Sequence, residues 1–174
     1  MDHPDRTSRT QQPDPLRWYA GLPCLVAALV VAVVFIVSWP NLPDPMAVHF
    51  DEAGNVNRST SPVELLLISE MTLLGLGLGV SRSAIRGSLA LPALYATSAA
   101  VGVSLGYLFT VLALVNADAS TADEARMPLW HLTVAAGLAA AAIFGAHVLT
   151  RREHPDGTDR PTASGSVGRR RGSR

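Results

Sequence analysis

The stretch AGLPCLVAALVVAVVFIVSW, residues 20–39, holds no charged side chain over 20 consecutive positions. An α-helix needs about 20 apolar residues to cross the hydrocarbon core of a bilayer. The apolar region of a cleaved signal peptide is shorter, roughly 7–15 residues, and precedes a pattern of small residues. This stretch ends instead in Ser38, Trp39 and Pro40. It therefore predicts a transmembrane helix that is not removed by cleavage.

Three more apolar segments follow, and each is long enough to cross a bilayer: residues 62–80, 88–116 and 129–150. Only 16% of the 174 residues are charged, against about 25% in ordinary soluble domains. Within hydrocarbon each backbone N–H and C=O must be hydrogen-bonded inside its own segment, which favours helices. We expect an all-α membrane protein whose four transmembrane helices form one domain over residues 18–150.

The basic residues predict how the chain is threaded through the membrane. All 14 of them are Arg. Twelve lie before the first predicted span, between the second and third, or after the fourth, and only Arg58 and Arg126 lie in the other two connections. Arginine accumulates on the cytoplasmic side of membrane proteins. We therefore expect a cell-membrane protein with both termini in the cytoplasm. The polar segments 1–17 and 151–174 are predicted to be disordered tails there.

Small residues at four-residue spacing allow transmembrane helices to approach closely. The predicted spans two, three and four each carry such a stripe. The glycines expected to pack against neighbouring helices are Gly75, Gly79, Gly102, Gly106, Gly137 and Gly145.

Two carboxylates, Glu64 and Glu70, fall within the second predicted span. Glu64 lies in the first turn and can reach water, whereas Glu70 lies eight residues after Pro62, about 12 Å from the start of the helix. A charged side chain at that depth is costly, so an acid there indicates either an ion-coupled or ligand-binding role or a protonated carboxyl. In the second case we expect a hydrogen bond to a hydroxyl group of another span, with Ser98, Ser104 and Thr110 as candidates.

The connection at residues 40–61 contains three prolines within six residues, at positions 40, 43 and 45, which stiffen the chain after the first span. Glu52 to Asn55 have the composition of a tight turn. We expect an ordered loop on the extracytoplasmic side, centred on His49. This histidine has three open interpretations: a hydrogen-bond donor that locks the loop, a pH- or ligand-sensing contact, or a metal ligand with nearby acids.

This connection resembles the bacterial family of unknown function that forms the N-terminal part of SdpI-type immunity proteins. The resemblance rests on Leu42, Pro43, His49, Phe50, Asp51 and Gly54, at the spacing of the family pattern. Ala47 departs from the family's usual proline, and Ser59 to Ser61 replace its usual aromatic residue and lysine. The resemblance implies a multi-pass membrane protein that in some members confers resistance to a secreted toxin.

We find no pattern of catalytic residues, and we expect neither an enzyme nor a protein with a cofactor or bound metal. The Arg169–171 run is interpreted as a contact to anionic lipid headgroups rather than to nucleic acid. The expected partners are the lipid bilayer and, at the outer loop 40–61, a secreted peptide or another membrane protein. A small transporter that uses Glu70, and a structural partner in a membrane complex, are the alternative functions.

Overall fold

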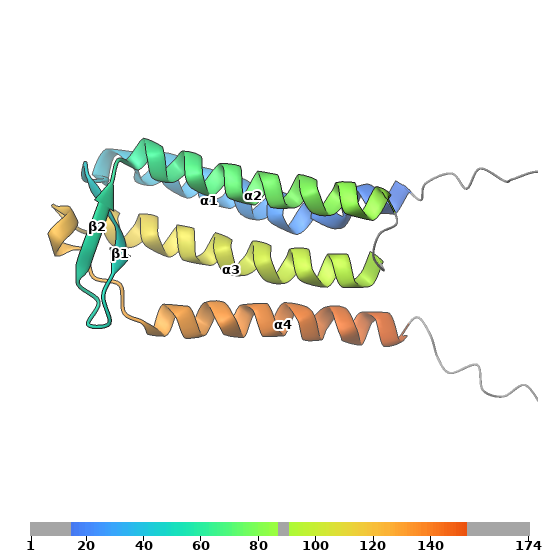
Figure 1. Ribbon diagram of the computed structural model, residues 1–174. Helices are drawn as coiled ribbons and strands as arrows, with labels where there is room; N and C mark the ends of the chain where they lie inside the picture. The colour runs from blue at the N-terminus through green and yellow to red at the C-terminus, as the bar shows by residue number, and fades with distance from the viewer. Residues whose placement is uncertain (1–14, 87–90, 153–174) are drawn as a thin grey trace, which may run out of the picture.

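The computed structural model describes residues 15–86 and 91–152. Four long α-helices run side by side: α1 (Leu22–Ser38), α2 (Pro62–Ile85), α3 (Leu91–Ala117) and α4 (Trp130–Arg152) (Figure 1). All four are long and apolar enough to cross a membrane. The 24 residues of α2 measure about 36 Å along the axis, which exceeds a hydrocarbon core of about 30 Å. The expected membrane protein with four candidate spans is therefore supported, and each helix lies within three residues of its predicted start.

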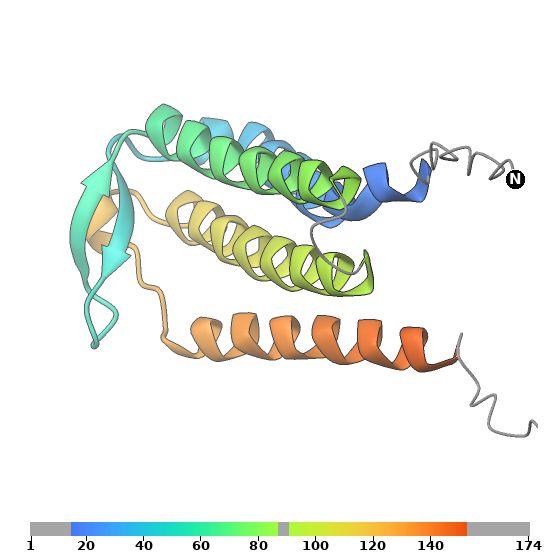
Figure 2. The same cartoon turned by 45° about the vertical axis from the view of Figure 1, so that its right-hand side comes forward.

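The segment between α1 and α2 contains two strands, so the fold is not all-α as predicted. Strands β1 (Met46–Phe50) and β2 (Val56–Thr60) pair antiparallel, with Met46 opposite Thr60 and Phe50 opposite Val56. The register shifts on both sides of His49. The hairpin lies across the ends of the helices instead of continuing their direction (Figures 1 and 2). A five-residue strand with two irregularities has no regular alternation of polar and apolar residues, which is why the sequence predicted only a loop.

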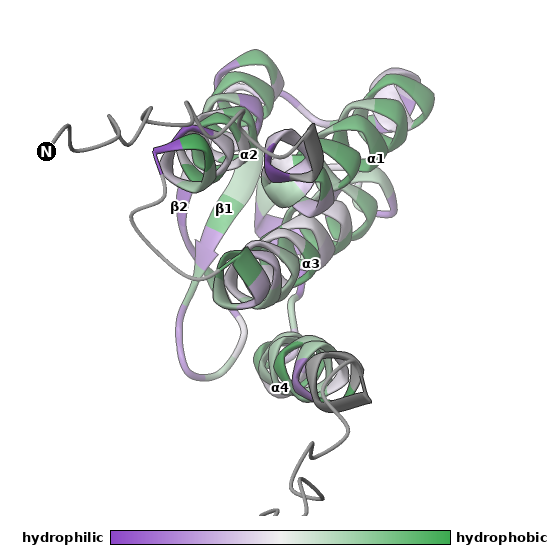
Figure 3. Cartoon of the chain, turned by 90° about the vertical axis from the view of Figure 1, so that its right-hand side faces the viewer, coloured by the Kyte–Doolittle hydropathy of each residue, from purple (hydrophilic) through white to green (hydrophobic). Residues whose placement is uncertain are grey.

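Seen along the helix axes, α1, α2 and α3 form a triangle, and α4 packs against α3 (Figure 3). Phe35 and Val31 of α1, Leu73 of α2 and Ala113 of α3 are fully buried where the three helices meet. Met46 of β1 closes this core at the hairpin end. Only 6% of the apolar segment of α4 is buried inside the protein, so this helix presents most of its surface to its surroundings.

At the end opposite the hairpin, a 3₁₀ helix, η1 (Pro15–Gly21), is fastened to α2. The Ser81 hydroxyl accepts a hydrogen bond from the Gly21 amide and donates one to the Trp18 carbonyl. The Arg17 guanidinium donates to the Ala84 carbonyl near the end of α2. Residues 15–17, which were predicted to belong to a tail, are therefore part of η1. The rest of both predicted tails, 1–14 and 153–174, lies outside the described residues.

The predicted packing glycines fall into two groups. Gly102 and Gly106 lie against α1, because a Cβ atom added to either would come within 3.0 Å of Cys24 or Ala27. At the other four positions, Gly75, Gly79, Gly137 and Gly145, an added Cβ would meet no atom within 4 Å.

Helix α2 instead approaches α1 through Gly77, which sequence reasoning assigned to no interface. A Cβ on Gly77 would lie 2.9 Å from Cδ2 of Leu25 in α1, and a Cβ on Gly21 of η1 would lie 1.9 Å from the Gly77 carbonyl oxygen. Spacing alone predicted the stripes, but which face of a helix meets a neighbour depends on the arrangement of the bundle.

Candidate functional site at the hairpin end of the bundle

A buried asparagine near the end of α3 fixes the hairpin to the bundle. Asn116 is fully buried, and its Oδ1 accepts a hydrogen bond of 2.7 Å from the Ala47 amide. Its Nδ2 donates to the Ala47 carbonyl at 2.9 Å and to the Leu112 carbonyl at 2.8 Å. The side-chain amide thus pairs with both backbone groups of Ala47, as a neighbouring strand would. A buried edge strand needs such a partner, because unpaired backbone groups are costly.

The turn of the hairpin is held by Asp51. Its Oδ1 accepts hydrogen bonds from the amides of Ala53 and Asn55, and its Oδ2 accepts one from the Asn55 side chain. The bonds from the Asn55 backbone and side chain are the main reason why the pKa of the Asp51 carboxyl lies below its ordinary value. Gly54 completes the turn with a φ of +80°, a conformation that other residues rarely adopt.

The hairpin tip rests on the connection between α3 and α4. A Cβ on Gly54 would lie 3.3 Å from the Met127 carbonyl oxygen, so the two backbones are in close contact. The same connection carries a short 3₁₀ helix, η3 (Ala122–Glu124), which also lies against both strands. The bundle end is therefore a cap built from two chain segments that are far apart in sequence.

A pocket of about 200 Å³ opens between these two segments. Its wall consists of one histidine and six apolar residues, contributed by β1, by the connection and by the first turn of α4: Val48, His49, Phe50, Met127, Pro128, Leu129 and Leu132. Two residues of the predicted loop motif, His49 and Phe50, are thus brought together at this pocket. Pockets that bind ligands are commonly apolar with a few placed polar groups.

His49 is exposed, and within the described residues its ring makes no hydrogen bond. The interpretation that His49 locks the loop by donating a hydrogen bond is therefore wrong, and Asn116 has that role. Across the hairpin His49 stands opposite Arg58. Among the described residues no three His, Cys, Asp or Glu side chains are grouped as metal ligands.

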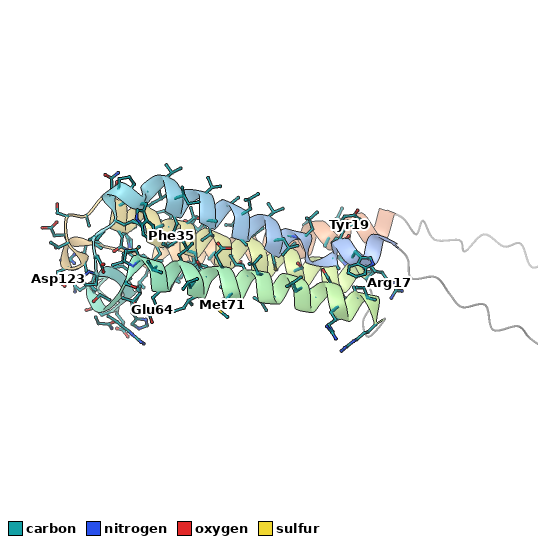
Figure 4. All side chains as sticks on the ribbon, turned by 90° about the horizontal axis from the view of Figure 1, so that it is seen from above. Arg17, Tyr19, Phe35, Glu64, Met71 and Asp123 are labelled. Atoms are coloured by element: carbon teal, nitrogen blue, oxygen red, sulfur yellow. The ribbon has the colours of Figure 1, made fainter. Side chains whose placement is uncertain are left out.

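The remaining motif residues support the hairpin. Leu42 packs against the core beneath the strands, and Pro43 lies half-buried just before them. The exposed charges of this end are mainly acidic, with Asp51, Glu52, Asp123 and Glu124 near the hairpin tip and η3. Figure 4 shows Asp123 and Glu64 at this end of the molecule and Arg17 at the other.

Glu64 and Glu70 occupy different surroundings on α2. Glu64 is exposed in the first turn, and its carboxylate accepts a hydrogen bond from the Thr60 hydroxyl. Oε1 of Glu70 is buried, and no group among the described residues donates a hydrogen bond to it. We had expected a hydrogen bond to Glu70 from Ser98, Ser104 or Thr110, and no such bond to Oε1 is formed. Ser98 contacts the Cys24 thiol and Ser104 donates to the Ala135 carbonyl.

A polar pair that sequence reasoning missed joins α3 to α4. The Tyr107 hydroxyl lies 2.7 Å from Nδ1 of His131, and the ring of Trp130 stacks on His131 at a centroid distance of 3.7 Å. Neither Tyr107 nor His131 is among the site residues predicted from the sequence. The two residues are 24 positions apart in different helices, so no local pattern reveals the contact.

Comparison with known families finds a match over part of the chain. The family described as "Domain of unknown function (DUF1648)" matches residues 25–73, which is less than half of the chain. The matched segment contains most of α1, the whole hairpin and the first half of α2. No curated protein and no solved structure matches the chain. The chain is therefore similar to this family over a helix–hairpin–helix unit.

Proposed function

We propose that this protein is a non-enzymatic, multi-pass protein of the cell membrane, with both termini in the cytoplasm and the hairpin on the extracytoplasmic side. In this orientation the ordered segment 40–61 is a recognition element of the SdpI-type immunity or sensing kind. Its ligand is a secreted peptide or the outer part of another membrane protein. The large apolar side chains exposed along the helices, such as Leu29, Met71 and Phe144, support insertion in lipid.

The observation that carries the recognition role is the pocket beneath the docked hairpin. Asn116 holds β1 in place through two hydrogen bonds to one residue. The pocket wall is then formed by His49 and Phe50 on one side and by Leu132 on the other. A rigid wall lowers the entropy cost of binding, because less of the chain must be ordered with the ligand.

The test is a comparison of variants in the native host, scored by tolerance to secreted peptides and by an envelope-stress reporter. His49→Ala removes the polar group of the pocket, and Leu132→Trp places a larger side chain in its space of about 200 Å³. We expect both to reproduce the deletion phenotype. Leu78→Trp is the matched control, since Leu78 is exposed on α2 and lines none of the pocket.

Insertion and protein amount must be equal in all strains. A deletion strain that changes neither readout would refute the immunity and sensing role. Full function in both pocket variants would show that this pocket is not the recognition site.

A transport role is the second candidate, and the buried Oε1 of Glu70 without a hydrogen-bond partner favours it. Acids in membrane spans commonly mark ion or proton pathways. Glu70→Gln keeps the shape of the side chain and removes its charge. In proteoliposomes with a measurable proton or solute flux, this variant is expected to abolish that flux if the second candidate holds. Unchanged flux would exclude Glu70 from transport.

A further inference from the structure

A second hollow, of about 400 Å³, lies between α3 and α4 at the end of the bundle opposite the hairpin. Most of its wall is small or apolar, and two residues, Thr97 and His147, are polar. The apolar part includes Pro92 and Ala96 of α3 and Ile143 and Ala146 of α4. The hollow is separated from the hairpin pocket by about half the length of α4, so the proposed recognition role does not use it.

Among the residues that the structure describes, those that carry a charge at this end of the bundle are all arginine. In the described residues of η1, the last two turns of α2, the first two turns of α3 and the last two turns of α4 there is no Asp or Glu. The basic residues there are Arg17, Arg82, Arg86, Arg151 and Arg152. Arg151 follows His147 by one helical turn, which places both residues on the same face of α4. Thus a hollow with a largely apolar wall opens at the end of the bundle where the described charged residues are all arginine.

We propose that this hollow binds an anionic phospholipid. An acyl chain lies between Ala96 and Ala146, and the phosphate lies at the end of the bundle near His147 and Arg151. A membrane lipid is the occupant that matches both features, because it joins an apolar chain to a negatively charged group at the depth where a span ends. Basic pockets between spans are known to hold anionic headgroups.

Native mass spectrometry of the full chain in a non-ionic detergent provides the test. The protein is offered equal amounts of phosphatidylglycerol and phosphatidylcholine with identical acyl chains. One basic residue near an anionic group contributes about fivefold in affinity, so we expect phosphatidylglycerol to be retained at least about fivefold more than phosphatidylcholine. Inorganic phosphate is added in a separate arm to distinguish a lipid from a free anion.

Two pairs of variants separate the chain site from the headgroup site. Ala146→Phe fills the hollow and is expected to abolish lipid retention, whereas Ala140→Phe, at an exposed position of α4 outside the hollow, is expected to keep it. Arg151→Gln is expected to lower the preference for phosphatidylglycerol about fivefold, and Arg58→Gln at the opposite end is expected to leave it unchanged. If Ala146→Phe does not give a monodisperse protein, Ala96→Leu takes its place.

Four outcomes would overturn the assignment. The first is equal retention of the two lipids by the unaltered protein. The second is unchanged preference in Ala146→Phe. The third is displacement of the lipid by inorganic phosphate. The fourth is a second copy of the chain bound in place of lipid. Because the readout is lipid bound to purified protein, it is independent of toxin tolerance and of the hairpin variants.

Discussion

Replacing Asn116 by alanine is the most informative perturbation of the hairpin end. The change leaves the amide and the carbonyl of Ala47 without their partner, while both stay in a buried position. Leaving one buried backbone group unpaired costs about 1–3 kcal/mol, so the two together cost about 2–6 kcal/mol. Water that enters at the end of the bundle reduces this cost, and we therefore take about 2 kcal/mol as the expected minimum.

Hydrogen exchange measures this cost as opening of the hairpin. A loss of about 2 kcal/mol raises the open population about 30-fold. In Asn116→Ala we expect the amides of β1 to exchange at least about 30-fold faster than in the unaltered protein, while the middle of α1 keeps its protection. The measurement is deuterium uptake of a peptide covering residues 42–50, with the protein in lipid nanodiscs.

Asn57→Ala provides the matched control, because Asn57 lies on β2, is exposed, and makes no side-chain hydrogen bond to any described residue. We expect the deuterium uptake of this peptide in Asn57→Ala to equal that in the unaltered protein. Equal uptake in the two alanine variants would refute the role of Asn116 as the anchor of the hairpin.

Two further predictions concern other parts of the fold. Gly21→Ala places a methyl group 1.9 Å from the Gly77 carbonyl oxygen, and we expect it to lower the free energy of unfolding by about 1–3 kcal/mol. In Gly79→Ala the added methyl group meets no atom within 4 Å, and we expect the free energy of unfolding to stay unchanged or to rise by up to about 1 kcal/mol. Thermal unfolding of both in the same detergent checks this, and similar shifts would contradict the close helix contact. Because folding lowers the pKa of the Asp51 carboxyl, the charged carboxylate stabilises the turn fully above pH 3.8, the ordinary pKa of an aspartate. This stabilisation is lost as the pH falls through the lower pKa of the folded protein. An NMR titration of the Asn55 amide should therefore have its midpoint below pH 3.8, and a midpoint at or above that value would contradict the hydrogen bonds of the turn.

The helices were predictable because their signal is local. A run of apolar residues such as 20–39 specifies a span by length and composition alone, and the observed helix α1 (Leu22–Ser38) falls within it. The turn at Glu52 to Asn55 was also readable, since glycine and asparagine have strong conformational preferences there.

The hairpin was not predictable because its short strands are irregular, and its anchor was not predictable because it depends on a contact between distant residues. Asn116 is 69 positions from Ala47, and in the sequence it only marks the polar end of a span. Dependence on distant residues also explains why the sequence did not identify the packing glycine of α2. Gly77 and Gly79 have equivalent local sequence, but only Gly77 faces α1. The pocket joins β1 to a connection about 80 residues further along the chain, so sequence reasoning found His49 and Phe50 but not Met127 and Leu132.

The recognition role requires that the hairpin faces the outside of the cell, and labelling of single cysteines tests this orientation most directly. The only native cysteine, Cys24, is buried and is replaced by alanine. Ala53→Cys then places a thiol at the exposed hairpin tip, and Ser164→Cys places one in the C-terminal segment. A membrane-impermeant maleimide is applied to intact cells and to permeabilised cells.

We predict that the cysteine at position 53 is labelled in intact cells and that the cysteine at position 164 is labelled only after permeabilisation. The opposite pattern would place the hairpin in the cytoplasm and contradict a role in recognising extracytoplasmic ligands.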